Sequence, residues 1–382
     1  MQKELLVSRK ISVNNFDVIR FLLASAVILC HSFVIYYGNE PFKKTDPFMV
    51  LSQEQISLGS VAVNFFFIIS GFLIVKSFEY SKTYRQYFSK RILRIYPGFV
   101  VAFLLSIFIA GFIAQVKHNS VSDYLQYLHD LHMKKLLMNL VTLQLPPLDY
   151  LYFKDLPVGG LNSSLWTIQF EFICYLIVPL LAFLGFFKRN WLFLVAFIAA
   201  YLLLFFQGIG YVMPYKNNQS LFLGNPFFFP RFITYFFSGA CFYIYRNKIV
   251  KTKMLTVAAF ACAISSFIWI KCVDQVLPLA GTYLLFYIAY HPRLQFSQFS
   301  RKGDYSYGLY LYGWPIQQVV MYFLTSYLNP FRLFFIATPL ALACAYASWH
   351  LVEKRFVYFR KRKALSIVPM APFSVVSGSM AK

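Results

Sequence analysis

Three side chains that can take part in chemistry lie within long apolar segments of this chain: Arg20, His31 and Glu171. An ionisable group inside a membrane costs about 3 kcal/mol or more, so such a residue indicates a functional site by default. Arg20 and His31 share the apolar segment 16–37. The eleven residue steps from Arg20 to His31 make about three helical turns and about 16 Å of rise, so both side chains lie on one helix face. The pair therefore predicts a polar track that runs into the membrane.

The composition of the chain is that of an integral membrane protein. Of its 382 residues, 59% are hydrophobic, 20% are aromatic and only 13% are charged, which is more apolar surface than a soluble core needs. Apolar stretches of about twenty residues are long enough to cross a bilayer. They predict an all-α fold of about ten transmembrane helices. The predicted spans are 14–37, 57–79, 91–114, 164–187, 190–210, 228–247, 254–272, 274–290, 306–328 and 332–352.

Basic residues are concentrated in alternate loops between these spans. If the N-terminus is inside, the inside segments hold most of the chain's 36 lysines and arginines, as cytoplasmic loops do. We therefore expect cytoplasmic N- and C-termini, one transmembrane domain over 1–363 and a disordered tail over 364–382. The long interruption 115–163 predicts an external loop with a short amphipathic helix near 124–143. The net charge of +22 follows from this bias and from attraction to anionic lipids, so we expect the lipid bilayer and no nucleic acid as a partner.

Four motifs lie in or beside the first four predicted spans. The first, Asn15-Phe-Asp-Val-Ile-Arg20, precedes His31, and the second is Asn64-Phe-Phe-Phe-Ile-Ile-Ser-Gly-Phe-Leu-Ile74. Within the second, the Ser-Gly pair predicts close helix packing, because small residues let membrane helices approach one another. The third, Lys90-Arg91-Ile-Leu-Arg94-Ile-Tyr-Pro97, opens the third span, and Leu165-Trp-Thr-Ile-Gln-Phe-Glu171 followed by Tyr175 opens the fourth.

In the order and spacing of these motifs, the chain resembles the membrane-bound acyltransferase-3 family, whose members acylate cell-surface sugars and some small molecules. Matching motifs continue as Arg231-Phe-x-x-Tyr-Phe-x-x-Gly239, Ser306-Tyr-Gly-Leu-Tyr-Leu-Tyr-Gly-Trp-Pro315 and Val352-Glu353-Lys354. The resemblance spans roughly residues 14 to 356. The chain departs from the family at Asn64, where Asp is frequent, and at Gly313, where His is frequent. The resemblance therefore implies that His31 is the catalytic histidine.

The resemblance implies acyl transfer from a cytosolic acyl-CoA thioester to a hydroxyl, which needs a base. His31 suits this role because a histidine has an unperturbed pKa of about 6.5. The alternative is a structural histidine hydrogen-bonded to a neighbouring helix. Arg20 either orders the first helix and contacts the donor, or pairs only with Asp17 one turn earlier. Glu171 orients the histidine, binds sugar hydroxyls or pairs with a buried arginine such as Arg231.

The basic side chains at the start of the third span are candidate ligands for the donor phosphates. Arg91 and Arg94 lie one turn apart, and guanidinium groups match phosphate oxygens well. Lys90 stands where the family commonly has Arg, and it keeps the charge without the planar fork. With the phosphates held at the cytosolic mouth, the long arm of coenzyme A would reach toward His31. The alternative is an ordinary cluster of inside-facing positive charge.

Two residues near the outer surface are candidate contacts for the acceptor. Trp166 is an interfacial aromatic at the start of the fourth span, and Arg231 lies at the outer end of the sixth. Arg231 would meet the acceptor or the oxyanion, or serve only as an interface anchor. His129 and His132 have the spacing of a metal site without an evident third ligand, so we expect no metal.

Three functions account for these features to different degrees. The first is an integral-membrane O-acyltransferase that places an acyl group, with acetyl expected, on a cell-surface or lipid-linked carbohydrate. The second is a transporter or flippase for a lipid-linked saccharide, which would use the same polar residues as a path but does not require the 90–97 cluster. The third, a non-catalytic partner of polysaccharide-biosynthesis proteins, gives no reason for ionisable groups in the bilayer. The expected location is the cell membrane, the inner or plasma membrane of a bacterium.

Overall fold

The computed structural model describes residues 14–116, 132–147, 152–208, 222–291 and 303–357, with a few single positions between these ranges. The described chain is helical, and its one β-bridge joins Ser220 to Gly224. The long helices are α2 (Phe16–Tyr37), α5 (Leu58–Glu79), α6 (Tyr84–Leu105), α10 (Trp166–Phe183), α11 (Trp191–Gly208), α12 (Phe229–Ile244), α16 (Ser306–Leu324) and α17 (Pro330–Ser348). The shorter ones are α3 (Asn39–Thr45), α4 (Pro47–Leu51), α7 (Gly111–Val116), α9 (Met133–Val141), α13 (Lys253–Ser265), α14 (Val273–Val276) and α15 (Thr282–Ala289).

The predicted all-α fold is confirmed, and each predicted span coincides with a helix or a group of helices. Among the described residues, 7 helices are long and apolar enough to cross a membrane. They are Phe16–Tyr37, Leu58–Glu79, Tyr84–Ala114, Ser163–Phe183, Trp191–Gly208, Pro226–Ile244 and Pro330–Val357. The apolar helices Lys253–Trp269 and Val273–Ala289 are shorter. α16 is less apolar because it carries several tyrosines and two glutamines, and most of its side chains are buried. The count of ten and the orientation of the termini stay predictions.

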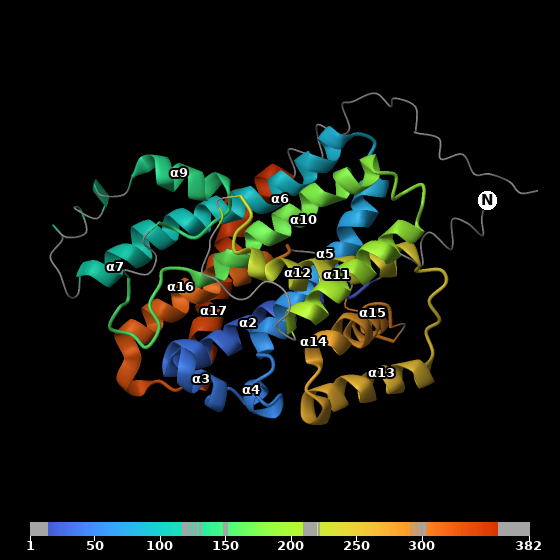
Figure 1. Ribbon diagram of the computed structural model, residues 1–382. Helices are drawn as coiled ribbons and strands as arrows, with labels where there is room; N and C mark the ends of the chain where they lie inside the picture. The colour runs from blue at the N-terminus through green and yellow to red at the C-terminus, as the bar shows by residue number, and fades with distance from the viewer. Residues whose placement is uncertain are drawn as a thin grey trace, which may run out of the picture.

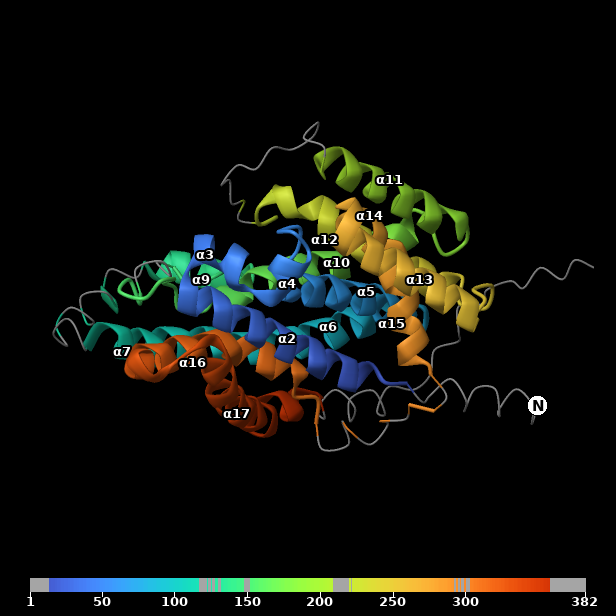
Figure 2. The same ribbon diagram turned by 90° about the horizontal axis from the view of Figure 1, so that it is seen from below.

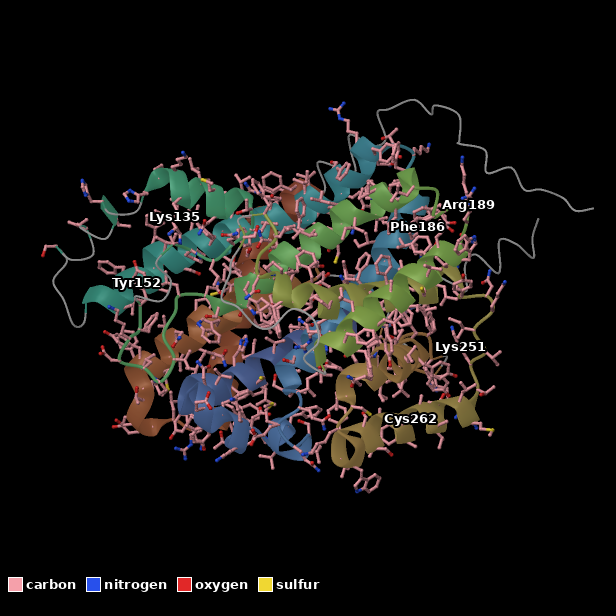
Figure 3. The ribbon with its side chains drawn as sticks, viewed as in Figure 1. Lys135, Tyr152, Phe186, Arg189, Lys251 and Cys262 are labelled. Carbon is pink, nitrogen blue, oxygen red and sulfur yellow. The ribbon has the colours of Figure 1, made fainter. Side chains whose placement is uncertain are left out.

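Residues of two predicted inside loops lie at the opposite end of the molecule from residues of the long predicted external loop. Figure 3 shows Arg189 and Lys251, from predicted inside loops, at one end, and Lys135 and Tyr152, from the predicted external loop, at the other. The helices run between these ends (Figure 1). In the view of Figure 2, α16 and α17 lie at one edge and α11 at the other, with α2, α5 and α6 between them.

The third long helix begins earlier than predicted. α6 starts at Tyr84 rather than at 91, because the side chain of Thr83 accepts a hydrogen bond from the backbone N–H of Gln86 at 3.1 Å and caps the helix there. The basic motif is therefore displaced from the first turn into the second and third turns. This places Arg91 and Arg94 beside neighbouring helices instead of at a free helix end.

Helices α5 and α12 approach each other closely at two glycines. A Cβ atom added to Gly71 would lie 1.9 Å from the carbonyl oxygen of Phe236, and one added to Gly239 would lie 1.9 Å from that of Ile68. The predicted close packing at Gly71 is confirmed. α5 also packs against α2 and α10, and α16 packs against α2, α6 and α17. These contacts bring α2, α5, α6, α10 and α16 around one shared space.

Two predicted features fall partly or wholly outside the described residues. α9 confirms a short helix within 124–143, and its apolar and polar residues are strongly segregated. Several positions between 117 and 131 lie outside the described chain. The predicted tail, 364–382, lies wholly outside it.

Candidate active site

A cavity of about 120 Å³ lies between α2, α5, α6, α10 and α16. The helix α5 supplies most of its apolar wall, with Phe66 and Leu73 among the lining residues. The polar side chains that line it are Arg20, Ser70, Arg91, Arg94, Thr167, Glu171, Tyr175, Ser306, Tyr307 and Tyr310. Four residues predicted for the site from the sequence, Arg20, Arg91, Arg94 and Glu171, therefore meet in one space.

Asp304, just before α16, joins two of these arginines. Its carboxylate lies 2.6 Å from Arg94 and 3.3 Å from Arg20, while Arg20 also pairs with Asp17. The other carboxylate oxygen of Asp304 accepts hydrogen bonds from the backbone N–H and the hydroxyl of Ser306. Burial alone would raise the pKa of Asp304, but the two arginines and Ser306 outweigh burial and hold this pKa well below its usual range. Arg20 is thus both paired and part of the cavity wall.

The basic residues of α6 have different surroundings. Arg91 donates a hydrogen bond to the Ser77 hydroxyl at 2.9 Å, and its guanidinium lies 5.7 Å from the centre of the Tyr175 ring. Its Nε is buried and makes no hydrogen bond to the described residues. Arg94 is bound by Asp304 and lies over the Tyr307 ring. Lys90 donates to the hydroxyl of Ser81 at 3.1 Å and is outside the cavity wall.

Glu171 faces this basic cluster. Its carboxylate accepts a hydrogen bond from the hydroxyl of Tyr175, one turn later on α10. Arg94, Arg20 and Arg91 are near enough to interact with it electrostatically. The charged groups that interact with Glu171 are therefore these three arginines, while Arg231 is hydrogen-bonded to Asn64.

His31 lies beyond the cavity rather than in its wall. It is half-buried on α2, and its ring meets the Trp314 ring edge-on at 4.9 Å between centres. The Trp314 indole N–H donates to the Gly160 carbonyl oxygen at 3.1 Å, which fixes the ring. The Nδ1 atom of His31 is buried and makes no hydrogen bond to the described residues. Tyr310, one turn before Trp314, does line the cavity.

The two residues predicted for the acceptor lie outside the cavity wall. Trp166 packs against the rings of Phe228 and Phe232, with ring centres 4.7 and 5.6 Å away. Arg231 donates to the side-chain oxygen of Asn64 at 2.9 Å, and its Nη2 atom is buried without a hydrogen bond to the described residues. Arg231 thus belongs to a separate polar contact between α12 and α5.

Sequence reasoning missed two acidic residues of the cluster. Asp304 is one of only 14 acidic residues in the chain and follows the basic pair Arg301 and Lys302. The rarity of acidic residues could have marked it as a candidate partner for the buried arginines. Glu353 is 3% exposed, accepts a hydrogen bond from Ser348 at 3.1 Å and interacts electrostatically with Arg94. An added Cβ at Gly98 would lie 3.2 Å from the Glu353 carboxyl carbon, so the absence of a side chain at Gly98 leaves room for this carboxylate. Among the described residues, no group of three potential metal ligands is found.

Comparison with known proteins identifies the family. The O-acetyl transferase of Shigella phage Sf6 is 29% identical over 346 residues, which cover 90% of this chain and 96% of that protein. Nodulation protein 10 of Rhizobium leguminosarum bv. viciae is 28% identical over 177 residues, 44% of each chain. No solved structure matches the chain significantly. A family model for the acyltransferase-3 domain matches residues 13–350. With its apolar helices, the chain is a multi-pass membrane acyltransferase and belongs to this family.

Proposed function

We propose that the protein transfers an acyl group, in the first place acetyl, from cytosolic acyl-CoA to a hydroxyl of a cell-surface or lipid-linked carbohydrate in the cell membrane. Membership of the acyltransferase family and the relative named as an O-acetyl transferase support this proposal. The observation that carries it is the cavity in which three arginines and Glu171 face an apolar wall. An acyl thioester of coenzyme A has the matching composition, with phosphates at one end and an apolar group at the other.

The size of the cavity suggests which part of the donor it would hold. At about 120 Å³ it is much smaller than the roughly 300 Å³ or more of a site for a drug-sized ligand. It would therefore take the acyl end of the donor arm, and the nucleotide would stay at its mouth. Arg91 is the best candidate for the phosphates, because its hydrogen-bonding partner is the neutral Ser77, whereas Arg94 is neutralised by Asp304. Lys90 adds positive charge nearby.

His31 would act as the base. In the proposed reaction the acceptor hydroxyl gives its proton to His31, and its oxygen attacks the thioester carbonyl carbon. The carbon–sulfur bond then breaks, and the departing thiolate takes the proton. His31 lies one turn of α16 beyond the cavity-lining Tyr310, because it contacts Trp314. Tyr310 therefore lies between the cavity and His31. Transfer would require the Tyr310 side chain to turn aside, so that the thioester carbonyl carbon meets the acceptor hydroxyl beside His31.

The proposal is tested with purified protein in vesicles, labelled acetyl-CoA and isolated surface glycans. We expect label on a glycan with the native protein and none with His31→Ala. The matched control is His350→Ala, because His350 is a histidine of the last long apolar helix that contacts Tyr305 at 3.3 Å and does not line the cavity. Full activity of His31→Ala would refute the role of the base. Absence of transfer to any glycan, together with saccharide flux across the vesicles, would instead support a transporter.

A further inference from the structure

The cavity has a polar end and an apolar end. Its α5 wall runs from Val63 to Ile74, in one stripe of residues three or four apart, which is about 16 Å of helix. One turn beyond Ile74, Ser77 binds Arg91 and marks the polar end. At the other end, the α5 wall consists of Val63, Phe66 and Phe67, without a charged side chain among them.

In this structure the apolar end of the cavity is closed by side-chain contacts. The hydroxyls of Thr167 and Tyr310 are hydrogen-bonded at 2.6 Å, and both residues are buried. The Phe66 ring meets the Tyr310 ring at 6.1 Å between centres and at an angle of 70°. Phe67 is stacked on Phe232 at 4.4 Å, so it cannot swing aside freely. A ligand entering from the polar end therefore meets a wall of rings.

We infer that the Val63–Phe67 end of the cavity is the acyl-binding site and that Phe66 limits the length of the acyl group it accepts. This inference rests on the proposed function and narrows its donor to short-chain acyl-CoA. The apolar wall suits the methyl group of an acetyl thioester, while the ring of Phe66 against Tyr310 leaves no open path for added methylenes. One methylene too many in a closed apolar site reduces specificity constants or affinity by about tenfold or more.

The limiting ring has a matched control one residue earlier on the same helix. Phe65 is also half-buried on α5, but it does not line the cavity and instead contacts Gly281. Replacing Phe65 removes the same aromatic volume from α5 without changing the proposed acyl site. Val63 gives a second, milder way to enlarge that site, because Val63→Ala removes only two methyl groups.

The experiment measures dissociation constants and kcat/KM with acetyl-, propionyl- and butyryl-CoA for the native protein, Phe66→Leu, Val63→Ala and Phe65→Leu. We expect the native protein to prefer acetyl- over butyryl-CoA by at least tenfold in both quantities. Phe66→Leu should reduce this preference by about tenfold and Val63→Ala should shift it in the same direction, while Phe65→Leu keeps the native ratio.

Three results would overturn the inference. They are equal use of all three donors by the native protein, an unchanged ratio in folded Phe66→Leu and Val63→Ala, and an equal change in Phe65→Leu. Binding separates this inference from the proposed function. Graded binding of the three donors without transfer to any acceptor would refute the proposed function and support the acyl-binding site. Equal transfer of all three acyl groups would support the proposed function and refute the acyl-binding site. Absence of binding would refute both.

Discussion

Replacing Asp304 with asparagine should destabilise the protein and weaken donor binding together. Asp304 is bound by Arg94 at 2.6 Å and by Arg20 at 3.3 Å, and so it ties α6 and α2 to the start of α16. Asparagine has the same shape and can still accept the hydrogen bonds of Ser306. The substitution therefore removes the negative charge and leaves two guanidinium groups without it.

The expected loss follows from the burial of the three side chains. Asp304 is 17% exposed, and Arg20 and Arg94 are 22% and 24% exposed. Removing one partner of a fully buried ion pair costs about 3–5 kcal/mol. Because this cluster is partly hydrated and asparagine keeps some hydrogen bonds, we expect about 2–3 kcal/mol less free energy of unfolding for Asp304→Asn.

The same loss should depend on pH in a definite direction. The pKa of Asp304 is held well below its usual range, so this group stabilises the fold at pH values above its unfolded pKa of about 3.9. Its contribution is lost as the pH falls below that value toward the folded pKa. The difference between native protein and Asp304→Asn should therefore be constant from about pH 5 to 8 and shrink below about pH 4.

Denaturant titration in detergent micelles, followed by circular dichroism, measures this difference, and a donor-binding assay gives the effect on affinity. Glu40→Gln is the control, because it breaks an exposed ion pair with Lys43 at 3.2 Å, whose charges are well hydrated. Glu40→Gln should leave both the unfolding midpoint and the donor affinity unchanged. An Asp304→Asn protein with the native unfolding midpoint at pH 7 would refute the conclusion that Asp304 stabilises the fold by joining α6 and α2 to the start of α16.

Two further substitutions test separate parts of the structure. Arg91→Lys keeps the charge but loses the planar fork, so KM for acetyl-CoA should rise about tenfold with kcat nearly unchanged, whereas Arg85→Lys on the exposed face of α6 should change neither. Gly239→Ala would place a Cβ 1.9 Å from the Ile68 carbonyl oxygen, so it should cost about 2 kcal/mol or more and lower the yield of monodisperse protein. Gly208→Ala, whose Cβ would lie 3.5 Å from its nearest neighbour, should be tolerated. Native kinetics for Arg91→Lys, or native stability for Gly239→Ala, would contradict these expectations.

Several charged residues of the candidate site could be predicted from the sequence. Arg20, Arg91, Arg94 and Glu171 were recognisable in the sequence because charged groups are rare in apolar segments, and the structure places all four around one cavity. The predicted start of the third helix was too late in the chain. The basic side chains before Pro97 lower the hydropathy there, although the helix already begins at Tyr84 after the Thr83 cap. Charged side chains lower the hydropathy of a segment, but they do not stop it from being helical. The start of a helix is set by backbone hydrogen bonds and capping, which hydropathy does not report.

The separation of His31 from the cavity could not be found in the same way. Helical periodicity puts Arg20 and His31 on one face of α2, which is a statement about a single helix. What each side chain meets depends on helices far away in the chain: Asp304 lies opposite Arg20, and Trp314 lies opposite His31. One continuous polar track was predicted, and the structure instead shows a cavity that ends at Tyr310, one turn short of Trp314.

The sequence by itself determined the all-helical architecture, the apolar segments long enough to cross a membrane and the resemblance to the family, because twenty-residue apolar runs and ordered motifs are local properties. Only the tertiary structure decided that Asp304 and Glu353 join the arginine cluster, that Arg231 pairs with Asn64, and that rings close the apolar end of the cavity. The physical reason is that these contacts depend on how the helices pack and rotate against one another. Glycines such as Gly71 and Gly239 permit that packing, because an added Cβ at either position would lie 1.9 Å from a carbonyl oxygen of the facing helix, which no linear pattern records.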